Sequence, residues 1–294
     1  MMRDKTRFLD ILKMHINLEE RLYMDKILKN QLQNKVYKVR TFNPSKNLYF
    51  NVVTVGDNRT MTVDGGGVNA TVIQADLAAT NGIIHIIDRV LGVPYTTVLD
   101  KLRTDPMLQN TYRLGQYQKF NEQLNNPDKR FTYFVPRDKA WENAKVAFPS
   151  AIKKLFMPEF MHIYGVATLE RHLVVSDVPY TMERIKQWSN ETHRGPFDSI
   201  ASTSSRREVE LPTVRGSLRI AVEERKDNTF IIHWKGEKIP VFKPNVECTN
   251  GIIHVIDFPF LKEGDIQISS ANSLRFMSPT LTLCTFAFVK FVLL

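Results

Sequence analysis

The chain has 294 residues, of which 43% are hydrophobic and 24% charged. These values are typical of a folded protein, and the length allows one large or two ordinary domains, each with its own core. The net charge of +9 is gathered at the start, because residues 1–47 carry eleven Lys or Arg and five Asp or Glu. Later basic clusters, Lys129-Arg130 and Arg206-Arg207, are short and lack aromatic residues interleaved to stack on bases. We therefore expect no nucleic-acid partner.

The chain repeats two of its segments in the same order. Residues 79–92 read ATNGIIHIIDRVLG and residues 248–261 read CTNGIIHVIDFPFL, at an offset of 169. Residues 12–27, LKMHINLEERLYMDKI, match residues 169–185, LERHLVVSDVPYTMERI, at an offset of 157 to 158. A shared order with a drifting offset indicates two homologous domains rather than a short solenoid repeat.

The second copy contains a motif that the first copy lacks. RFTYFVPRDKAW, residues 130–141, has no counterpart before His15. We therefore expect three parts: residues 1–92 as the C-terminal half of a domain, residues 93–262 as a complete domain, and residues 263–294 as a polar spacer and tail. The front half of the first domain and a secretory signal are expected upstream, because MMRDKTRFLDIL has too short an apolar run for a signal peptide.

In the first part, the pattern predicts strands joined by turns. DGGGVN, residues 64–69, lies between two strand-like segments and does not open a helix, so it predicts a hairpin turn and not a nucleotide-binding loop. Thr80-Asn81-Gly82 supplies a sharp turn, and IIHIID after it is apolar on both faces, as in an interior strand. With a period of two, Ile84 and Ile86 share one face, whereas the other face carries Ile83, His85 and Ile87.

The second part is typical of helices followed by strands. Apolar residues recur at helical spacing between Pro94 and Asn125, FTYFV predicts a strand, and a short helix follows it. Residues 151–173 are again helical in pattern, and from Glu208 onward five strand-like segments are separated by turn residues. This order predicts a segregated α+β fold rather than alternating βαβ units.

Four of the seven histidines belong to the repeated segments. His85 and Asp88 suggest a metal site at first sight, but strand positions three apart point to opposite faces, and no third ligand stands at a useful spacing. We therefore expect His15, His85, His172 and His254 to be core residues that hydrogen-bond to neighbouring backbone or side chains. We expect no metal and no cofactor.

The chain also lacks the common catalytic motifs. It contains no G-x-S-x-G, H-E-x-x-H or C-x-x-C sequence and no phosphate-binding glycine loop. Its adjacent acidic pairs, Glu19-Glu20 and Glu223-Glu224, are expected to face solvent. The sequence therefore favours a binding protein and not an enzyme.

Three separated motifs together resemble the fasciclin domain: FTYFVPRDKAW, LERHLVV and TNGIIHVID, in this order. The resemblance covers residues 93–262 and, in part, residues 1–92. It implies a wedge of two β-sheets with helices packed around it, in tandem, with the first copy incomplete. It also implies scaffold roles for the residues in the two family boxes, in the central motif and in their counterparts in the first copy: Phe131, Pro136, Asp138, His172, Thr249, Asn250, Gly251, His254 and Asp257, with His15, Asn81, Gly82, His85 and Asp88 in the first copy.

The resemblance further implies a function. The resemblance to fasciclin-domain proteins of the neuronal cell-adhesion type implies homophilic adhesion between cells, axon guidance and fasciculation. It implies no catalysis. The alternative is a matrix-type module that binds integrins or glycosaminoglycans. The basic residues 1–47 are the feature of this sequence that favours a polyanion partner.

An extracellular location makes three acceptor sequons available for glycosylation, at Asn58, Asn69 and Asn190. Of the two cysteines, Cys284 lies in the terminal tail, so an extracellular location leaves Cys248 as the single thiol of the domains in an oxidising compartment. Two interpretations of Cys248 stay open. It is either a small buried apolar residue or one half of a disulfide whose partner lies upstream.

The last residues have the layout of a lipid-anchor signal. Three small residues, Ser269 to Ala271, precede a spacer of eight residues and a largely apolar stretch from Thr280 to Leu294. A transmembrane helix needs about 20 apolar residues, and this stretch is shorter and contains Lys290. We therefore predict a lipid anchor at Ser269 or Ser270 and a location on the outer leaflet of the plasma membrane.

Overall fold

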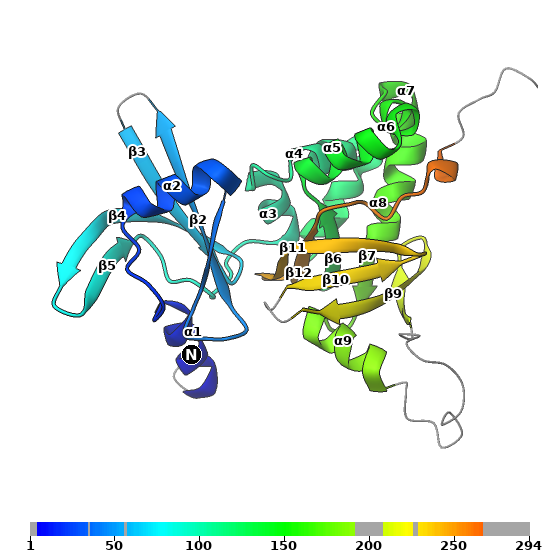
Figure 1. Cartoon of the computed structure of the whole chain (residues 1–294). Coiled ribbons are helices and arrows are strands. Elements are labelled where there is room, and N and C mark those ends of the chain that lie inside the picture. Colours follow the sequence, from blue (N-terminus) through cyan, green and yellow to red (C-terminus); the bar gives the residue numbers. More distant parts are fainter. Residues whose placement is uncertain (1–4, 35, 56–57, 192–207, 226–228, 267–294) are drawn as a thin grey trace, which may run out of the picture.

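Figure 1 shows the computed structural model of the chain, which describes residues 5–34, 36–55, 58–191, 208–225 and 229–266. The described residues form two units that lie side by side. The N-terminal unit contains the elements α1 to β5, and the C-terminal unit contains α3 to η3. The predicted α+β class is confirmed, because each unit combines helices with a largely antiparallel sheet.

The N-terminal unit is an antiparallel meander with two helices. Its five strands are hydrogen-bonded in the order β1-β2-β3-β4-β5. Its elements are α1 (Lys5–Met14), α2 (Met24–Asn34), β1 (Tyr37–Arg40), β2 (Asn47–Val55), β3 (Asn58–Gly65), β4 (Val68–Ala79) and β5 (Gly82–Ile87). Apolar side chains from the helices and from one face of the sheet form its core, which includes Met14, Ile27, Phe50, Met61 and Val63.

The predicted glycine hairpin joins β3 to β4. Gly65 pairs with Val68 across the turn. Gly66 and Gly67 between them have φ angles of 58° and 84°. Positive φ at both central positions is the geometry of a type I′ turn, which glycine adopts without a steric penalty. The prediction of a hairpin turn is therefore confirmed.

The C-terminal unit is a closed barrel with helices packed against it (Figure 1). Its helices are α3 (Val98–Thr104), α4 (Gln109–Gly115), η1 (Tyr117–Asn125), α5 (Asp138–Ala147), α6 (Pro149–Leu155), α7 (Pro158–Phe160), η2 (Met161–Gly165), α8 (Val166–His172), α9 (Met182–Glu191) and η3 (Glu263–Asp265). Its strands are β6 (Arg130–Pro136), β7 (Leu173–Ser176), β8 (Val209–Thr213), β9 (Gly216–Glu224), β10 (Phe230–Trp234), β11 (Glu237–Cys248) and β12 (Gly251–Ile256). These elements agree with the predicted helical and strand segments.

The strand order of the barrel is β10-β11-β12-β6-β7-β8-β9, and it closes because β9 pairs with β10. Strand β6 runs parallel to β12, whereas it is antiparallel to β7 on its other side. Two apolar clusters line the barrel. One lies under the helices α3 to α8 and includes Phe131, Tyr133 and Ile253. The other includes Met182 and Ile185 of α9 together with residues of β8 to β12.

The N-terminal unit repeats the back half of the C-terminal unit. The elements α1, α2 and β1 to β5 correspond in order to α8, α9 and β8 to β12. Even an irregularity is repeated, since Asp76 and Asn245, 169 residues apart, have φ angles of 60° and 53°. Both residues lie where the register of the long strand shifts against its neighbour. The internal repeat seen in the sequence is therefore a repeat of topology.

The two copies differ at the last strand. In the C-terminal unit, β12 has a neighbour on each side, and all its residues are buried. In the described part of the N-terminal unit, β5 pairs with β4 alone, and Ile84 and Ile86 are 54% and 43% exposed. The prediction of an interior strand was therefore wrong for the first copy. The apolar sequence of β5 is nearly that of β12. However, β12 is buried because β6 pairs with its second edge, whereas β5 has no such neighbour among the described residues.

Candidate functional site: the histidine scaffold and the junction of the units

Two buried histidines tie separate parts of the C-terminal unit together. The ring nitrogens of His172 lie 2.7 Å from the carbonyl oxygen of Thr168 and 2.8 Å from the backbone nitrogen of Phe260. Those of His254 lie 2.8 Å from the carbonyl oxygen of Tyr180 and 3.1 Å from the backbone nitrogen of Asn245. Each ring thus accepts from one N–H and donates to one C=O, which requires a neutral imidazole.

Burial favours this neutral form. It lowers the pKa of His172 to about 3 and that of His254 to about 4. Both rings have no exposed surface. They hold an α-helix and a strand to distant backbone segments, as the sequence predicts for core histidines.

The first copy makes the same four contacts. His15 lies 2.8 Å from the carbonyl oxygen of Ile11 and 3.1 Å from the backbone nitrogen of Leu91. His85 lies 2.7 Å from the carbonyl oxygen of Leu22 and 3.3 Å from the backbone nitrogen of Asp76. Each partner corresponds to the partner of His172 or His254 at the offset of the repeat. The predicted hydrogen bonds are therefore present.

The predicted burial is not present in the first copy. His15 is exposed and His85 is half-buried. For His85, the reason is the open side of β5. In the C-terminal unit, Phe134 of β6 packs on the ring of His254, whereas β5 has no second neighbouring strand among the described residues. The prediction that His15 and His85 are core residues was wrong in this respect.

The acidic residues of the second box and its repeat bind neighbouring groups of the protein. Asp88 pairs with Arg89 and accepts a hydrogen bond of 2.8 Å from the backbone N–H of Thr71. The contact with Arg89 is the main reason that the pKa of Asp88 is lowered. Asp257 pairs with Arg137 at the end of β6. No group of three His, Cys, Asp or Glu side chains that could hold a metal occurs among the residues that the structure describes.

The remaining box residues of the C-terminal unit lie where β6 and β12 meet the helices. Asn250 is buried, accepts from the backbone of Val98 at 2.8 Å, and donates to the carbonyl oxygens of Leu124 and Asn126. Asp138 accepts from the backbone of Asn110 at 2.8 Å. Three further hydrogen bonds involve box residues. The backbone N–H of Phe131 donates to the carbonyl oxygen of Asn250, and that of Thr249 donates to the carbonyl oxygen of Thr96. The hydroxyl of Thr111 donates to the carbonyl oxygen of Pro136.

Glycine is required at position 251. A Cβ atom there would lie 2.4 Å from the carbonyl oxygen of Phe131 on the neighbouring strand. Its counterpart Gly82 has no atom within 4 Å of the corresponding position, and the adjacent Asn81 is exposed. The same residue types therefore stand in two different environments.

The junction of the two units contains a buried charge cluster. Asp64 of β3 lies 2.8 Å from the ammonium group of Lys101 on α3 and 3.6 Å from that of Lys243 on β11. The carboxylate of Asp105 also lies 3.6 Å from the ammonium group of Lys101. All four side chains are at most 8% exposed. Lys101 and Asp105 are four residues apart along the chain, but the sequence offers no pattern that brings Asp64 and Lys243 to them, because these two lie on distant strands.

The charges of the cluster stabilise one another. Burial alone favours the neutral form of each group, but the ammonium groups of Lys243 and Lys101 outweigh it and lower the pKa of Asp64. Likewise, Asp64 and Asp105 outweigh the effect of burial and raise the pKa of Lys101. The carboxylate of one unit is thus held between two cations of the other.

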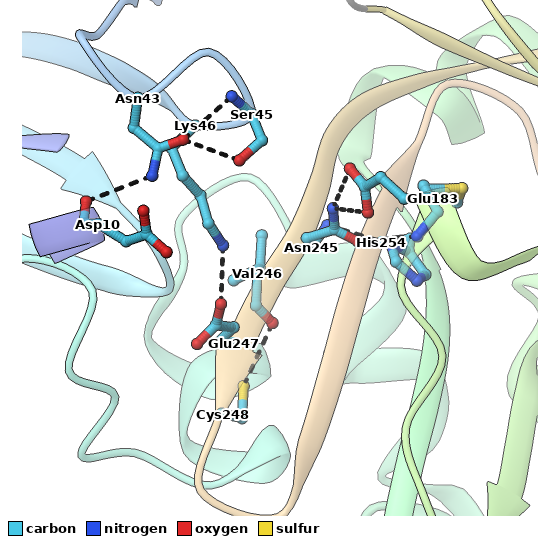
Figure 2. Close-up of polar contacts among 11 residues, drawn as sticks. Asp10, Asn43, Ser45, Lys46, Glu183, Asn245, Val246, Glu247, Cys248 and His254 are labelled. Atoms are coloured by element: carbon cyan, nitrogen blue, oxygen red, sulfur yellow. Dashed lines mark hydrogen bonds and ion pairs between the residues drawn. The ribbon is translucent and has the colours of Figure 1, made fainter. Parts of the chain in front are cut away.

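Further contacts surround this cluster. Figure 2 shows Lys46 of the N-terminal unit reaching Glu247 on β11, with 2.8 Å between the charged atoms. The rings of Tyr49 and Phe242 lie 6.1 Å apart. The hairpin glycine Gly67 packs so tightly that a Cβ atom there would lie 1.9 Å from the carbonyl oxygen of Glu247. The junction therefore combines ionic, aromatic and backbone contacts.

The structure places two of the sequons on strands of the N-terminal unit and one on α9. Asn69 is exposed at the start of β4, Asn58 begins β3, and Asn190 lies near the end of α9. Cys248 is buried, and its sulfur lies 3.9 Å from the carbonyl oxygen of Val246 (Figure 2). The predicted anchor residues Ser269 and Ser270 lie outside the described residues. Within the described residues, no helix is long and apolar enough to cross a membrane.

Comparison with known proteins agrees with the repeat. The sequence matches the Fasciclin domain family over residues 1–94 and 106–262. It is 49% identical to Fasciclin-1 of Drosophila melanogaster over 93% of this chain and 39% of that protein. It is 48% identical to Fasciclin-1 of Schistocerca americana over 92% of this chain and 38% of that protein.

A solved structure is similar as well. The FAS1 domain pair from the insect cell adhesion molecule fasciclin I matches with a TM-score of 0.79 and 49% identity, over 90% of this chain and 84% of that chain. The chain spans about two fifths of the length of the two curated relatives. The family model covers most of this sequence, in both units. The chain belongs to the fasciclin-domain family.

Proposed function

We propose that this chain is the adhesive part of a cell-surface protein that binds a second copy of itself on an opposing cell. The observation that carries the proposal is its similarity, across both units, to the domain pair of an insect cell adhesion molecule. The chemistry of the box residues agrees with this role, because their polar groups bind backbone and neighbouring side chains of the same chain. We infer that the chain is not an enzyme, and that it acts through its surfaces.

The junction suits such a role. Two modules held in one orientation present their surfaces together, and a partner then binds without the entropic cost of ordering a linker. The buried cluster around Asp64 opposes rotation of the units, because rotation would separate the carboxylate from Lys101 and Lys243. We propose the domain limits 1–92 and 93–262, with residues 263–294 leading into the spacer and anchor signal; the first of these residues still pack on the C-terminal unit, where Asp265 pairs with Arg171 and Ile266 is buried.

Mixing of labelled cells tests the adhesion proposal. Cells that express the protein in one colour are mixed with non-expressing cells in another colour. Homophilic adhesion predicts aggregates of the first colour alone, and equal inclusion of non-expressing cells would refute it. In neurons, the same activity would bring axons into bundles and guide them, and depletion of the protein is expected to loosen such bundles.

The second candidate is a matrix-type module that binds integrins or glycosaminoglycans. The basic charge of residues 1–47 favours a polyanion partner. Added heparin distinguishes the two candidates. It is expected to leave homophilic aggregates intact, whereas a glycosaminoglycan-binding module would lose its cell contacts.

We further propose that the protein is held on the outer leaflet by a lipid attached at Ser269 or Ser270. Phosphatidylinositol-specific phospholipase C applied to intact cells is then expected to release it into the medium. Retention on the cells, while a lipid-anchored control protein is released, would support a transmembrane tail. Glycosylation at Asn58, Asn69 and Asn190 predicts that a glycosidase increases gel mobility, and that Asn→Gln variants lose the shift one site at a time.

A further inference from the structure

A cavity of about 330 Å³ lies between the two units, beside the buried charge cluster. Its wall on the N-terminal unit consists of residues of β2, β3 and β4, among them Thr62 and Asn69. Its wall on the C-terminal unit consists of residues 105–107, which lead from α3 to α4, and of the first residues of α5. Asp64 and Lys243 also line it, so the cavity adjoins the ion pairs of the junction.

The alternation of side chains along β4 turns Asn69 toward this cavity. Val68 and Ala70 on either side of it belong to the core of the N-terminal unit, so the Asn69 side chain lies on the opposite face of the sheet. Asn69 pairs in register with Asp64, whose carboxylate binds two lysines of the C-terminal unit. Asn69 is also exposed. A group attached to its amide nitrogen would therefore leave the sheet at the mouth of the cavity.

Asn69 begins the sequon Asn69-Ala70-Thr71, and the first sugar of an N-linked glycan suits the cavity. This sugar, N-acetylglucosamine, is neutral and carries hydroxyls, an acetamide group and a methyl group. Asp138 and Lys139 offer an acceptor and a donor to its polar groups, whereas Met107 offers apolar surface. The volume lies at the lower end of the range of small-ligand sites, about 300–1,000 Å³, which fits one sugar rather than a longer chain.

We propose that the first sugar of a glycan on Asn69 occupies this cavity and contacts the C-terminal unit. The inference rests on the glycosylation of Asn69 proposed above. That transfer joins the amide nitrogen of Asn69 to the anomeric carbon of the sugar, breaks the bond from this carbon to the diphosphate of a lipid-linked donor, and releases the amide proton.

The bound sugar would connect the two units at a second point beside the ion pairs. It would lie between Asn69 on the sheet and residues 105–107 with the start of α5 on the opposite wall. Rotation of the units would separate it from that wall, as it would separate Asp64 from Lys101 and Lys243. The glycan would therefore help to hold the units in one orientation.

A glycosidase that cleaves the bond between sugar and asparagine tests the contact. The full chain is expressed in animal cells behind an added signal peptide, and mass spectrometry follows the release of each glycan from the folded protein. We expect the Asn69 glycan to be released about tenfold more slowly than from the unfolded chain, because the enzyme reaches the bond only when the cavity opens. An Asn69 that carries no glycan would overturn the proposal, and occupancy of Asn58 and Asn190 is scored separately.

Position 238 provides a matched control site. Lys238 is the counterpart of Asn69 at the offset of 169 residues, and it is exposed on β11. The substitutions Lys238→Asn and Pro240→Thr together introduce a sequon there, and we expect its glycan to be released as fast as from the unfolded chain. Met107→Ala, which shortens a side chain of the opposite wall, is expected to speed release at Asn69 and not at position 238. Equal release at the two sites, or no effect of Met107→Ala, would overturn the proposal.

Hydrogen exchange tests the contact without the control site and decides if that variant does not fold. In the glycosylated chain, Asn69→Gln removes this glycan alone and is expected to speed exchange at Met107 and at the first residues of α5. In the chain from bacteria, which carries no glycan, the same substitution is expected to leave exchange there unchanged. Equal effects in the two chains would refute the contact, whatever the cell-mixing result.

Discussion

Replacement of Asp64 by asparagine removes one charge from the buried junction and keeps the size of the side chain. The variant leaves two ammonium groups, those of Lys101 and Lys243, beside the single remaining carboxylate of Asp105. Removal of one partner of a buried ion pair costs about 3–5 kcal/mol, because the other charge stays buried without compensation. Asp105 still lies 3.6 Å from Lys101, so we expect the lower part of this range, about 3 kcal/mol.

Urea unfolding followed by tryptophan fluorescence measures the effect, since the three tryptophans all lie in the C-terminal unit. Glu247→Gln is the matched control, because it also neutralises an acid at the junction without a change in size. The Lys46–Glu247 pair is 28% and 34% exposed, so its loss is expected to cost less than about 1 kcal/mol. Equal losses in the two variants would refute the claim that the Asp64 cluster, rather than surface pairing, holds the units together.

Three more predictions concern the scaffold. Because burial lowers the pKa of His172 to about 3 and of His254 to about 4, the unfolded chain binds protons first as the pH falls below about 6.5. The free energy of unfolding should then decrease from pH 6.5 to pH 4 by at most about 1.4 kcal/mol per pH unit for each histidine; equal values at pH 7 and pH 5 would contradict this. Gly67→Ala should lower the melting temperature more than Gly216→Ala, because both have positive φ but only the first meets a backbone oxygen at 1.9 Å; equal shifts would mean that backbone strain alone acts. Burial raises the pKa of the Cys248 thiol to about 12, so thiol reagents should label it only after unfolding and to the same extent without reductant; a need for reductant would indicate a disulfide.

The sequence predicted most of the fold because its signals are local. Hydrophobic spacing identified the helical region that begins after Pro94, and Thr97 closes a capping box with Asp100 at the first of those helices. The glycines of residues 64–69 predicted the hairpin because both central positions need positive φ. Periodicity and turn chemistry act over a few residues, so sequence alone can reveal them.

Burial in the first copy was not predictable in the same way. The sequence around His85 is almost that of His254, and the hydrogen bonds are the same, yet one ring is half-buried and the other fully buried. The difference depends on a neighbouring strand, β6, which pairs with β12 and not with β5. A local pattern specifies what a strand can bury, whereas the neighbouring strands decide what it does bury.

The junction was missed for a related reason. Asp64 lies in the hairpin segment DGGGVN, where the glycines explained the turn and the acid carried no separate signal. Lys101 lies on a helix 37 residues later and Lys243 on a strand near the end of the described residues. Only the packing of two units brings them within ion-pair distance.

Aggregation of coated beads tests the central claim, that the chain binds itself, most directly. Purified chain is coupled to red and to green beads, and a third, uncoated set carries another dye. The account predicts clusters that mix red and green, exclude the uncoated beads and persist in heparin. Coated beads that stay dispersed, or that take up uncoated beads as readily as one another, would contradict it.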